Sequence, residues 1–274
     1  MAREATQPAA APSLLTPAPA PIEWRQPWFQ PFAEPGARVL ARVAHGAPLH
    51  EALDAECGAP VRFVAHDALP AGVAYERYIF ESRLCPTRPG LHDFFNGLCW
   101  LRMPRSKQQL NALQAAAIAA AAEGAPRGPL RDAITVLDEN GALLDAPPAL
   151  WEALLAREWH RLFIDLRPLW QQAQLLVFGH ALLEKLVLPR KPITAHVWCA
   201  AAPLADLAQA DAWLAGELTP ERLAAKPFTP LPLLGIPGWC PGNQNFSFYD
   251  DSLVFRPRGE QQAGAGTEHR GRGA

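Results

Sequence analysis

The densest group of chemically active side chains in this 274-residue sequence lies between Arg88 and Asn96. His92 and Asn96 are four residues apart, so on a helix they share one face and can point into a cleft. His92 would then act as a general base or a metal ligand, oriented by Asp93 or Asn96. The alternative is structural, with Asp93 complementing the positive end of the helix while His92 and Asn96 bond neighbouring backbone.

A second pair, His180 and Glu184, has the i, i+4 spacing that lets two ligands meet one metal ion from a single helical turn. Two ligands do not make a site, and the alternative is a buried histidine paired with a carboxylate for structural reasons. If His92 or Asp93 converged on this pair, the set would supply three or four ligands. The metal-ligand candidates for a divalent ion are therefore His92, Asp93, His180 and Glu184.

The stretch from residue 83 to residue 107 carries five Lys or Arg residues and a single acid, Asp93. This local charge predicts an anionic ligand, a phosphate or a carboxylate, held near two helix N-termini. The alternative is a solvated basic helix face. Arg131 is a further ligand-binding candidate, because an arginine at the start of a strand can form an ion pair with a buried carboxylate. The ligand-binding candidates are Arg88, Arg102, Arg105, Lys107 and Arg131.

Helical periodicity predicts the elements that carry these residues. Apolar residues recur at helical spacing from Leu91 to Leu101, and Pro104 begins a second helix that runs to about Ala122 and ends at Gly124. A short helix opens at Pro48, and further helices are expected at 148–157, about 180–187 and 204–216. The first ordered region, about 24–56, is expected to pack as an outer layer.

The strands are predicted from alternation and turn chemistry. Residues 61–64 and 75–80 are strand candidates, and 132–144 reads as a hairpin whose turn is Asp138-Glu139-Asn140-Gly141. Asp138 and Asn140 are interpreted as turn residues. The Pro-, Gly- and aromatic-rich segment 227–257 is expected to wrap the surface. The predicted fold class is α+β, a predominantly helical single domain with a small antiparallel β-sheet.

Composition predicts one globular domain at 23–257 between two disordered tails, an Ala/Pro-rich one at 1–22 and another at 258–274. The five cysteines are odd in number and widely separated, which indicates free thiols in a reducing compartment. No signal-peptide pattern and no membrane-length apolar run is present, so a cytoplasmic protein is expected. A net charge of −2 excludes binding of nucleic acid or membrane by bulk electrostatics.

Several segments resemble a proteobacterial family of unknown function, domain of unknown function 3025, over roughly residues 24–257. They include Tyr75-Glu76, Pro86-Thr87-Arg88, His92-Asp93-Phe-Phe-Asn96-Gly-Leu98-Cys-Trp100, Arg131-Asp132 through Gly141, Phe178-Gly-His180 through Lys185, Leu234-Gly-Ile-Pro-Gly-Trp239 and Phe248-Tyr-Asp-Asp251. The resemblance implies one domain and a bacterial origin, and it names no reaction.

A second likeness is to the HNH, or His-Me finger, nucleases, through His92-Asp93, Asn96, Lys107 and Asn111. In those enzymes a histidine activates water, an asparagine follows in a loop and a helix supplies the last metal ligand. The sequence departs from that pattern, because only four positions separate His92 from Asn96 and His92 falls on a helical stripe. The likeness is therefore an analogy.

Two functions follow from these patterns. The first is a hydrolase-like site, with or without a divalent metal, for a phosphorylated or nucleic-acid substrate, built from His92, Asp93, Asn96, His180 and Glu184. The second is a non-catalytic binding or adaptor protein that uses the aromatic-rich segments 24–32 and 236–255 as surfaces. Walker-type phosphate loops, the G-x-G-x-x-G fingerprint, the G-x-S-x-G elbow and H-E-x-x-H are absent. Whether the chain is an enzyme stays open at this point.

Overall fold

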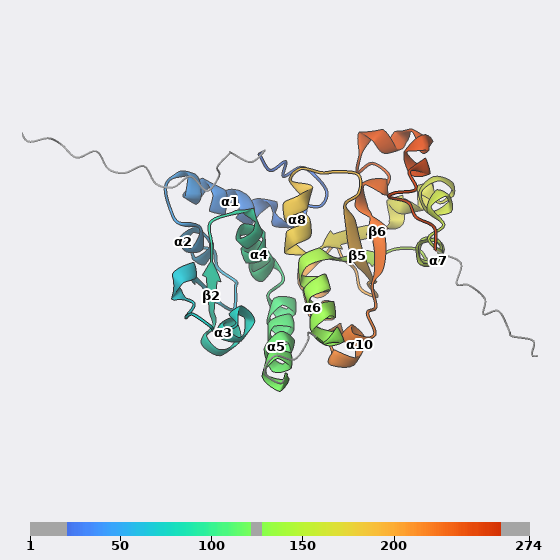
Figure 1. The fold of residues 1–274 in the computed structure, drawn as a ribbon. Coiled ribbons are helices and arrows are strands. Elements are labelled where there is room, and N and C mark those ends of the chain that lie inside the picture. Colours follow the sequence, from blue (N-terminus) through green and yellow to red (C-terminus); the bar gives the residue numbers. More distant parts are fainter. Residues whose placement is uncertain (1–20, 122–127, 259–274) are drawn as a thin grey trace, which may run out of the picture.

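The computed structural model describes residues 21–121 and 128–258. The predicted tails fall almost wholly outside these residues, as does the predicted end of the second helix at Ala122 and Gly124. The α-helices in the described part are α1 (Ala33–Ala44), α2 (Leu49–Asp54), α3 (Tyr75–Ser82), α4 (Leu91–Arg102), α5 (Pro104–Ala120), α6 (Pro129–Asn140), α7 (Pro148–Ala156), α8 (His180–Leu186), α9 (Leu207–Glu217) and α10 (Pro220–Ala224) (Figure 1).

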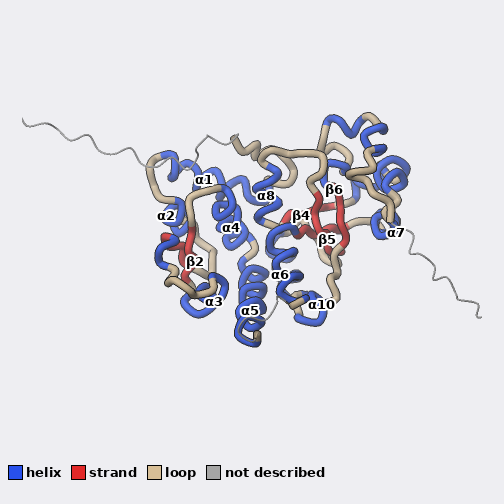
Figure 2. Tube along the Cα trace, viewed as in Figure 1, coloured by secondary structure: helices blue, strands red, loops and turns tan. Residues whose placement is uncertain are grey.

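The strands of the described part form two separate sheets (Figure 2). Strands β1 (Arg62–Ala65) and β2 (Leu84–Thr87) pair in parallel. The larger sheet has the order β4-β3-β5-β6, from β4 (Gln174–Val177), β3 (Gly141–Asp145), β5 (Thr194–Cys199) and β6 (Thr229–Pro232). Its central β3–β5 pair is parallel and the two outer pairs are antiparallel, so the sheet is mixed rather than the antiparallel one predicted.

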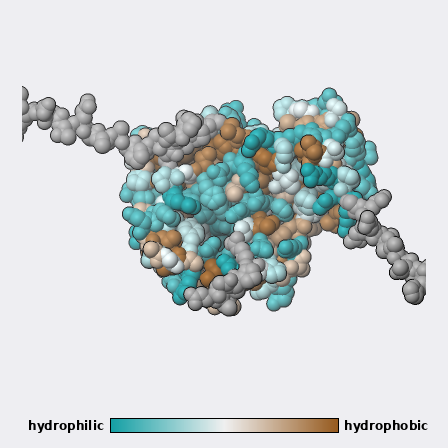
Figure 3. Space-filling view, viewed as in Figure 1, coloured by the Kyte–Doolittle hydropathy of each residue, from teal (hydrophilic) through white to brown (hydrophobic). Residues whose placement is uncertain are grey.

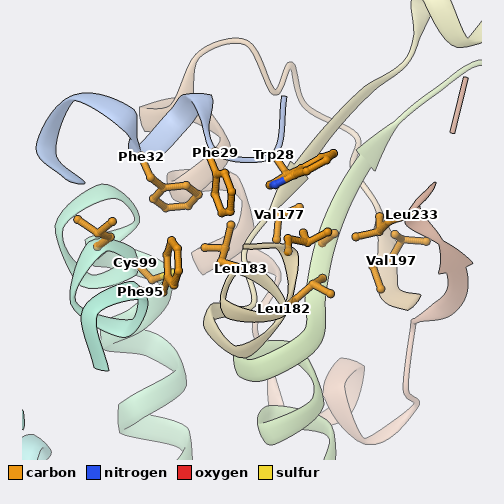
Figure 4. Close-up of a cluster of buried hydrophobic side chains, with 14 of the residues drawn as sticks. Trp28, Phe29, Phe32, Phe95, Cys99, Val177, Leu182, Leu183, Val197 and Leu233 are labelled. Carbon is orange, nitrogen blue, oxygen red and sulfur yellow. The ribbon is translucent and has the colours of Figure 1, made fainter. Parts of the chain in front are cut away.

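The larger sheet lies between two hydrophobic clusters, and alternate residues of β3 face each of them. Ala142 and Leu144 belong to the cluster that includes α4, α8 and the N-terminal aromatic residues, whereas Leu143 packs with α6, α9 and α10 on the other side. Figure 4 shows Leu182 and Leu183 of α8 between the aromatic rings and the valines of the sheet. The predominantly helical α+β prediction is therefore confirmed in outline.

The predicted hairpin at 132–144 is wrong, because residues 129–140 form helix α6 and the chain enters β3 directly at Gly141. Ala133, Ile134 and Leu137 are buried at helical spacing, and Pro129 stands in the first turn, where its fixed φ suits a helix. A side chain at Gly141 would lie 2.4 Å from the carbonyl oxygen of Leu137, so the sharp exit from the helix requires glycine.

The strand predicted at 75–80 is also wrong, because these residues form helix α3. Tyr75 and Ile79 are one helical turn apart and face inward, while Arg77 and Glu81 form an i, i+4 ion pair on the outer face. Local helical pairing thus prevails over the aromatic and β-branched composition that favours a strand. Residues 62–65 are a strand as predicted, but it pairs in parallel with β2.

The aromatic segments predicted to lie on the surface belong mostly to the core. Trp28, Phe29 and Phe32 are buried, and so are Tyr249 and Phe255 of the C-terminal segment. The outer layer predicted for residues 24–56 therefore supplies core aromatic side chains. The helices predicted at 91–101, 104–122, 148–157, 180–187 and 204–216 are confirmed within the described residues, with small shifts of their ends. None of the described helices has the length and hydrophobicity needed to span a membrane.

Candidate functional site

Ends of four helices, α4, α5, α6 and α8, meet between the two-stranded sheet and the four-stranded sheet (Figure 1). His92 lies in the first turn of α4, and His180 is the first residue of α8. Asp138 comes from the last turn of α6. A methyl group on Gly179 would lie 2.5 Å from the carbonyl oxygen of Glu139, so glycine is needed for α8 to approach the end of α6 this closely. The convergence of His92, His180 and Glu184 that the sequence left open does occur.

The converging side chains form a continuous row of polar contacts. Glu184 Oε2 lies 3.0 Å from His92 Nδ1, and His92 Nε2 lies 3.1 Å from His180 Nε2. His180 Nδ1 faces Asp138 Oδ2 at 3.6 Å, beyond hydrogen-bond distance, and is otherwise without a partner. Each histidine is thus flanked by a carboxylate on one side and by the other histidine on the second side.

The row continues into the protein through a buried lysine. Lys107 Nζ donates to Asp138 Oδ1 at 2.5 Å and to Asn96 Oδ1 at 2.9 Å, and Asn96 Nδ2 reaches the Tyr75 hydroxyl at 3.4 Å. Burial alone would raise the pKa of Asp138, but the positive charge of Lys107 lowers it below its usual value. Asp138 is therefore a carboxylate at neutral pH.

Burial lowers the pKa of His180 to about 4, since desolvation outweighs the attraction of Asp138 and Lys107 adds repulsion. The ring is therefore neutral at pH 7. A proton on Nδ1 suits the neighbouring Asp138 carboxylate, and a lone pair on Nε2 then accepts from His92 Nε2–H. The opposite tautomer would set the Nδ1 lone pair of His180 against a carboxylate oxygen.

The two histidines differ in accessibility. The His92 side chain is 43% exposed, and that of His180 is 7% exposed. Their rings meet edge to face with centroids 4.6 Å apart. His92 is therefore accessible to a ligand from solvent, whereas His180 is buried and contacts the inner side of the His92 ring.

A cavity of about 290 Å³ opens beside these histidines. It extends between α3, α5 and α6 and is lined by Tyr75, Glu76, Ile79, Arg88, His92, Asp93, Asn96, Trp100, Lys107, Leu110, Asn111, Gln114, Ile134, Thr135, Asp138, Glu139 and His180. Four of these residues are acidic and two are basic. The volume suits a small molecule rather than a polymer enclosed in the cavity.

Asp93 performs a local task in spite of its place at the cavity. Its Oδ2 accepts from the Arg88 backbone N–H at 2.6 Å, and its carboxylate pairs with the Arg88 guanidinium at 3.3 Å. This pairing raises the pKa of Arg88. Asp93 therefore closes the turn before α4, as in the structural alternative, and it does not orient His92. That role belongs to Glu184.

The predicted cluster of basic ligand-binding residues does not assemble. Arg102 donates to the Pro31 carbonyl oxygen, and the Arg105 and Ser106 backbone N–H groups at the start of α5 are bonded by the Asp211 carboxylate. Neither Arg102, Arg105 nor Arg131 lines the cavity. Arg131 lies in α6 rather than at a strand start. Only Arg88 and Lys107 reach the cavity, and each is paired with a carboxylate.

Within the described residues, no group of three or more His, Cys, Asp or Glu side chains is arranged to hold a metal ion. His92 uses both ring nitrogens on Glu184 and His180, and Asp93 is held by Arg88. Lys107 already neutralises Asp138. His92 also lies in a helix, without the strand-end position of the HNH nucleases. The arrangement gives no support to the predicted metal ligands.

Several residues of the cavity are not among the predicted site residues, namely Asp138, Tyr75, Glu76, Trp100 and Gln114, and Asn111 entered only through the likeness to the HNH nucleases. Asp138 was assigned to a turn that does not exist. The clearest overlooked signal is in α5, where Lys107, Asn111 and Gln114 recur at i, i+4 and i+7 within an alanine-rich helix. A polar stripe at that spacing marks one helix face.

These features define a helical α+β protein with a paired-histidine site at a small cavity. A family model described as "Protein of unknown function (DUF3025)" matches residues 61–259. The chain belongs to this family. The match confirms the family resemblance for that region and includes every residue of the site described above. No curated protein and no solved structure matches the chain.

Proposed function

We propose that the protein is a hydrolase that uses His92 and His180 as a metal-independent acid-base pair on a small substrate in the adjoining cavity. The proposal is supported by the row from Glu184 through His92 and His180 to Asp138, which borders that cavity. A carboxylate that holds a histidine in one tautomer, with the second nitrogen near a ligand space, is the usual arrangement of a general base.

The reaction needs one proton to leave water and one to reach the leaving group. His92 takes the proton of a water molecule at Nε2 as the water oxygen bonds to the electrophilic carbon or phosphorus atom. The imidazolium is stabilised by Glu184, and the same proton is returned to the leaving group when its bond breaks. Before these steps the Nε2 proton of His92 passes to solvent from its exposed ring as the substrate displaces the contact with His180, which stays neutral beside Asp138.

The cavity gives less support to the predicted phosphorylated or nucleic-acid substrate. Arg88 and Lys107 are the basic residues of its lining, and Asp93 and Asp138 neutralise them. Two further carboxylates, Glu76 and Glu139, also line it. An anion would meet a local excess of negative charge, so the proposal is restricted to the acid-base chemistry.

The adaptor hypothesis is weakened in one of its two motivating observations, the aromatic surface segments, while the absence of standard catalytic motifs stands. Trp28, Phe29 and Phe32 of the first segment are buried, and so are Tyr249 and Phe255 of the second, in which Phe246 is exposed. Figure 3 shows a mainly hydrophilic face on which hydrophobic residues form separate patches. On this face of the described residues, no broad apolar surface favours an adaptor over an enzyme.

Hydrolysis of p-nitrophenyl acetate, glycine p-nitroanilide, p-nitrophenyl phosphate and bis-p-nitrophenyl phosphate, each measured with EDTA, tests the proposal. His92→Gln should lower kcat/KM on the best substrate by about 100-fold or more, in the range expected for a lost general base. His66→Gln, an exposed histidine outside the cavity, is the matched control and should keep full activity. Wild-type rates in His92→Gln, or no turnover of any of the four compounds, would overturn the proposal.

A further inference from the structure

One face of α5 carries buried polar residues along the length of the cavity. Lys107, Asn111 and Gln114 lie at i, i+4 and i+7, and all three are at least nine-tenths buried. At about 1.5 Å per residue, Gln114 lies about 10 Å along the helix axis from Lys107. Lys107 contacts Asp138 beside the histidines, so Gln114 marks the end of the cavity that is distant from them.

This distant end presents hydrogen-bond acceptors that have no donors. Gln114 is 3% exposed, and its Oε1 has no hydrogen-bond partner among the described residues. The amide nitrogen of Asn111 donates to the Glu76 carbonyl oxygen at 2.7 Å, which leaves its oxygen as the remaining acceptor. A buried acceptor without a donor costs about 1–3 kcal/mol, so an occupant that supplies donors is favoured.

The charge of this end has the same implication. Glu76 is a lining residue of the cavity, it takes part in no ion pair among the described residues, and the neighbouring Arg77 pairs with Glu81. The Lys and Arg residues of the cavity lining, Lys107 and Arg88, are already paired with Asp138 and Asp93. A carboxylate beside acceptor oxygens, with no free cation, attracts a group that is positively charged and carries several N–H donors.

We propose that the end of the cavity formed by Glu76, Asn111 and Gln114 is a subsite for a primary ammonium group of the substrate. This inference names the substrate class of the proposed hydrolase and rests on that function only for the reaction at the other end. The substrate is a small amine whose hydrolysable ester or amide bond lies beside His92 while its ammonium group occupies the distant end of the cavity. The three N–H bonds of the ammonium match the three acceptor groups.

The test compares three small probes of one shape by titration calorimetry on the full chain, namely butylamine, butanol and butyrate. Butylamine should bind, and its affinity should exceed that of butanol and of butyrate by at least about tenfold. Glu76→Gln and Gln114→Met should each weaken butylamine binding by about tenfold or more, because the first removes the negative charge that faces the ammonium group and the second removes an acceptor oxygen.

Two matched variants control for changes elsewhere. Gln108→Met alters a glutamine of the same helix that does not line the cavity, and Glu221→Gln removes an exposed carboxylate outside it. Both should bind butylamine as the wild type does. Circular dichroism of the two subsite variants and the two control variants should show the wild-type helix content. Gln114→Glu keeps an acceptor oxygen and adds a negative charge, so it should bind butylamine at least as tightly as the wild type does.

The outcomes separate the subsite from the proposed reaction. Equal binding of the three probes, tighter binding of butyrate, or unchanged butylamine affinity in Glu76→Gln and Gln114→Met would overturn the ammonium subsite, even if His92→Gln abolished hydrolysis. Selective butylamine binding that both substitutions weaken would support the subsite, even if none of the four chromogenic compounds were hydrolysed.

Discussion

His180 should make the folded protein less stable in mild acid, and the size of the effect follows from its burial. The pKa of His180 is lowered from 6.5 to about 4 in the folded state, chiefly by desolvation. The unfolded chain therefore binds a proton between these values that the folded protein does not. Stability from this group is present above pH 6.5 and is lost as the pH falls toward 4. At about 1.4 kcal/mol per pH unit, the loss is about 3 kcal/mol.

Urea unfolding of the wild type and of His180→Gln at pH 7, 5.5 and 4 measures this loss. The free energy of unfolding of the wild type should fall more steeply than that of the variant, with a difference of about 3 kcal/mol between pH 7 and pH 4. The groups facing His180 are Asp138, Lys107 and His92, and Asp138 remains ionised through most of this range because its pKa is lowered.

His196 also has a pKa lowered by burial, so it contributes in the same direction, and His196→Gln measures its share. The comparison uses the pH dependence, so a constant loss of stability in His180→Gln does not affect it. Parallel curves for the wild type and His180→Gln, within about 0.5 kcal/mol, would refute the assignment of a buried neutral imidazole.

Three further sets of substitutions test the framework of the site by urea unfolding. Lys107→Met leaves the Asp138 carboxylate without its cation and should lower the free energy of unfolding by about 3 kcal/mol. Adding Asp138→Asn to this variant should recover part of the loss. Equal stability of the single and double variants would contradict the pairing. Asp211→Asn should cost about 1 kcal/mol, because Asp211 bonds two N–H groups at the start of α5; no change would remove its capping role. Gly97→Ala should destabilise the protein by about 1–3 kcal/mol, because the added methyl group would lie 2.5 Å from the side chain of Leu53 in α2. Gly216→Ala, at a helical position with open space around it, should stabilise the protein by up to about 1 kcal/mol. A change of the same sign in both variants would refute the packing argument.

The helices that position the site were largely predictable, because their signals are local. The apolar stripe of α4 and the proline that begins α5 are each contained within one or two turns of sequence. The error at 132–144 arose where two local signals conflict. Asp138-Glu139-Asn140-Gly141 has turn composition, but burial of Ile134 and Leu137 against the sheet decides the conformation. Tertiary packing, which a short window does not contain, outweighs turn propensity there.

The convergence of the site could not be obtained from spacing alone. His92 and Glu184 are separated by 92 positions, and their contact depends on the packing of α4 against α8. The prediction of an anionic ligand beside the basic residues failed for the same reason. The N-terminus of α5, which the sequence offers to a ligand, is bonded by the carboxylate of Asp211 on the distant helix α9. Pairing between distant elements decides which charges remain available, and only the fold specifies it.

The distribution of protons connects the inner and outer parts of the site. Lys107 balances Asp138, so the buried end carries no net charge and leaves His180 neutral. A proton added to His92 is balanced by Glu184. Protonation of His92 therefore makes the whole row neutral, whereas a neutral His92 leaves one negative charge on it. Because both states keep the buried half unchanged, His92 can gain and lose a proton beside the cavity without placing a new uncompensated charge in the core, as acid-base turnover requires.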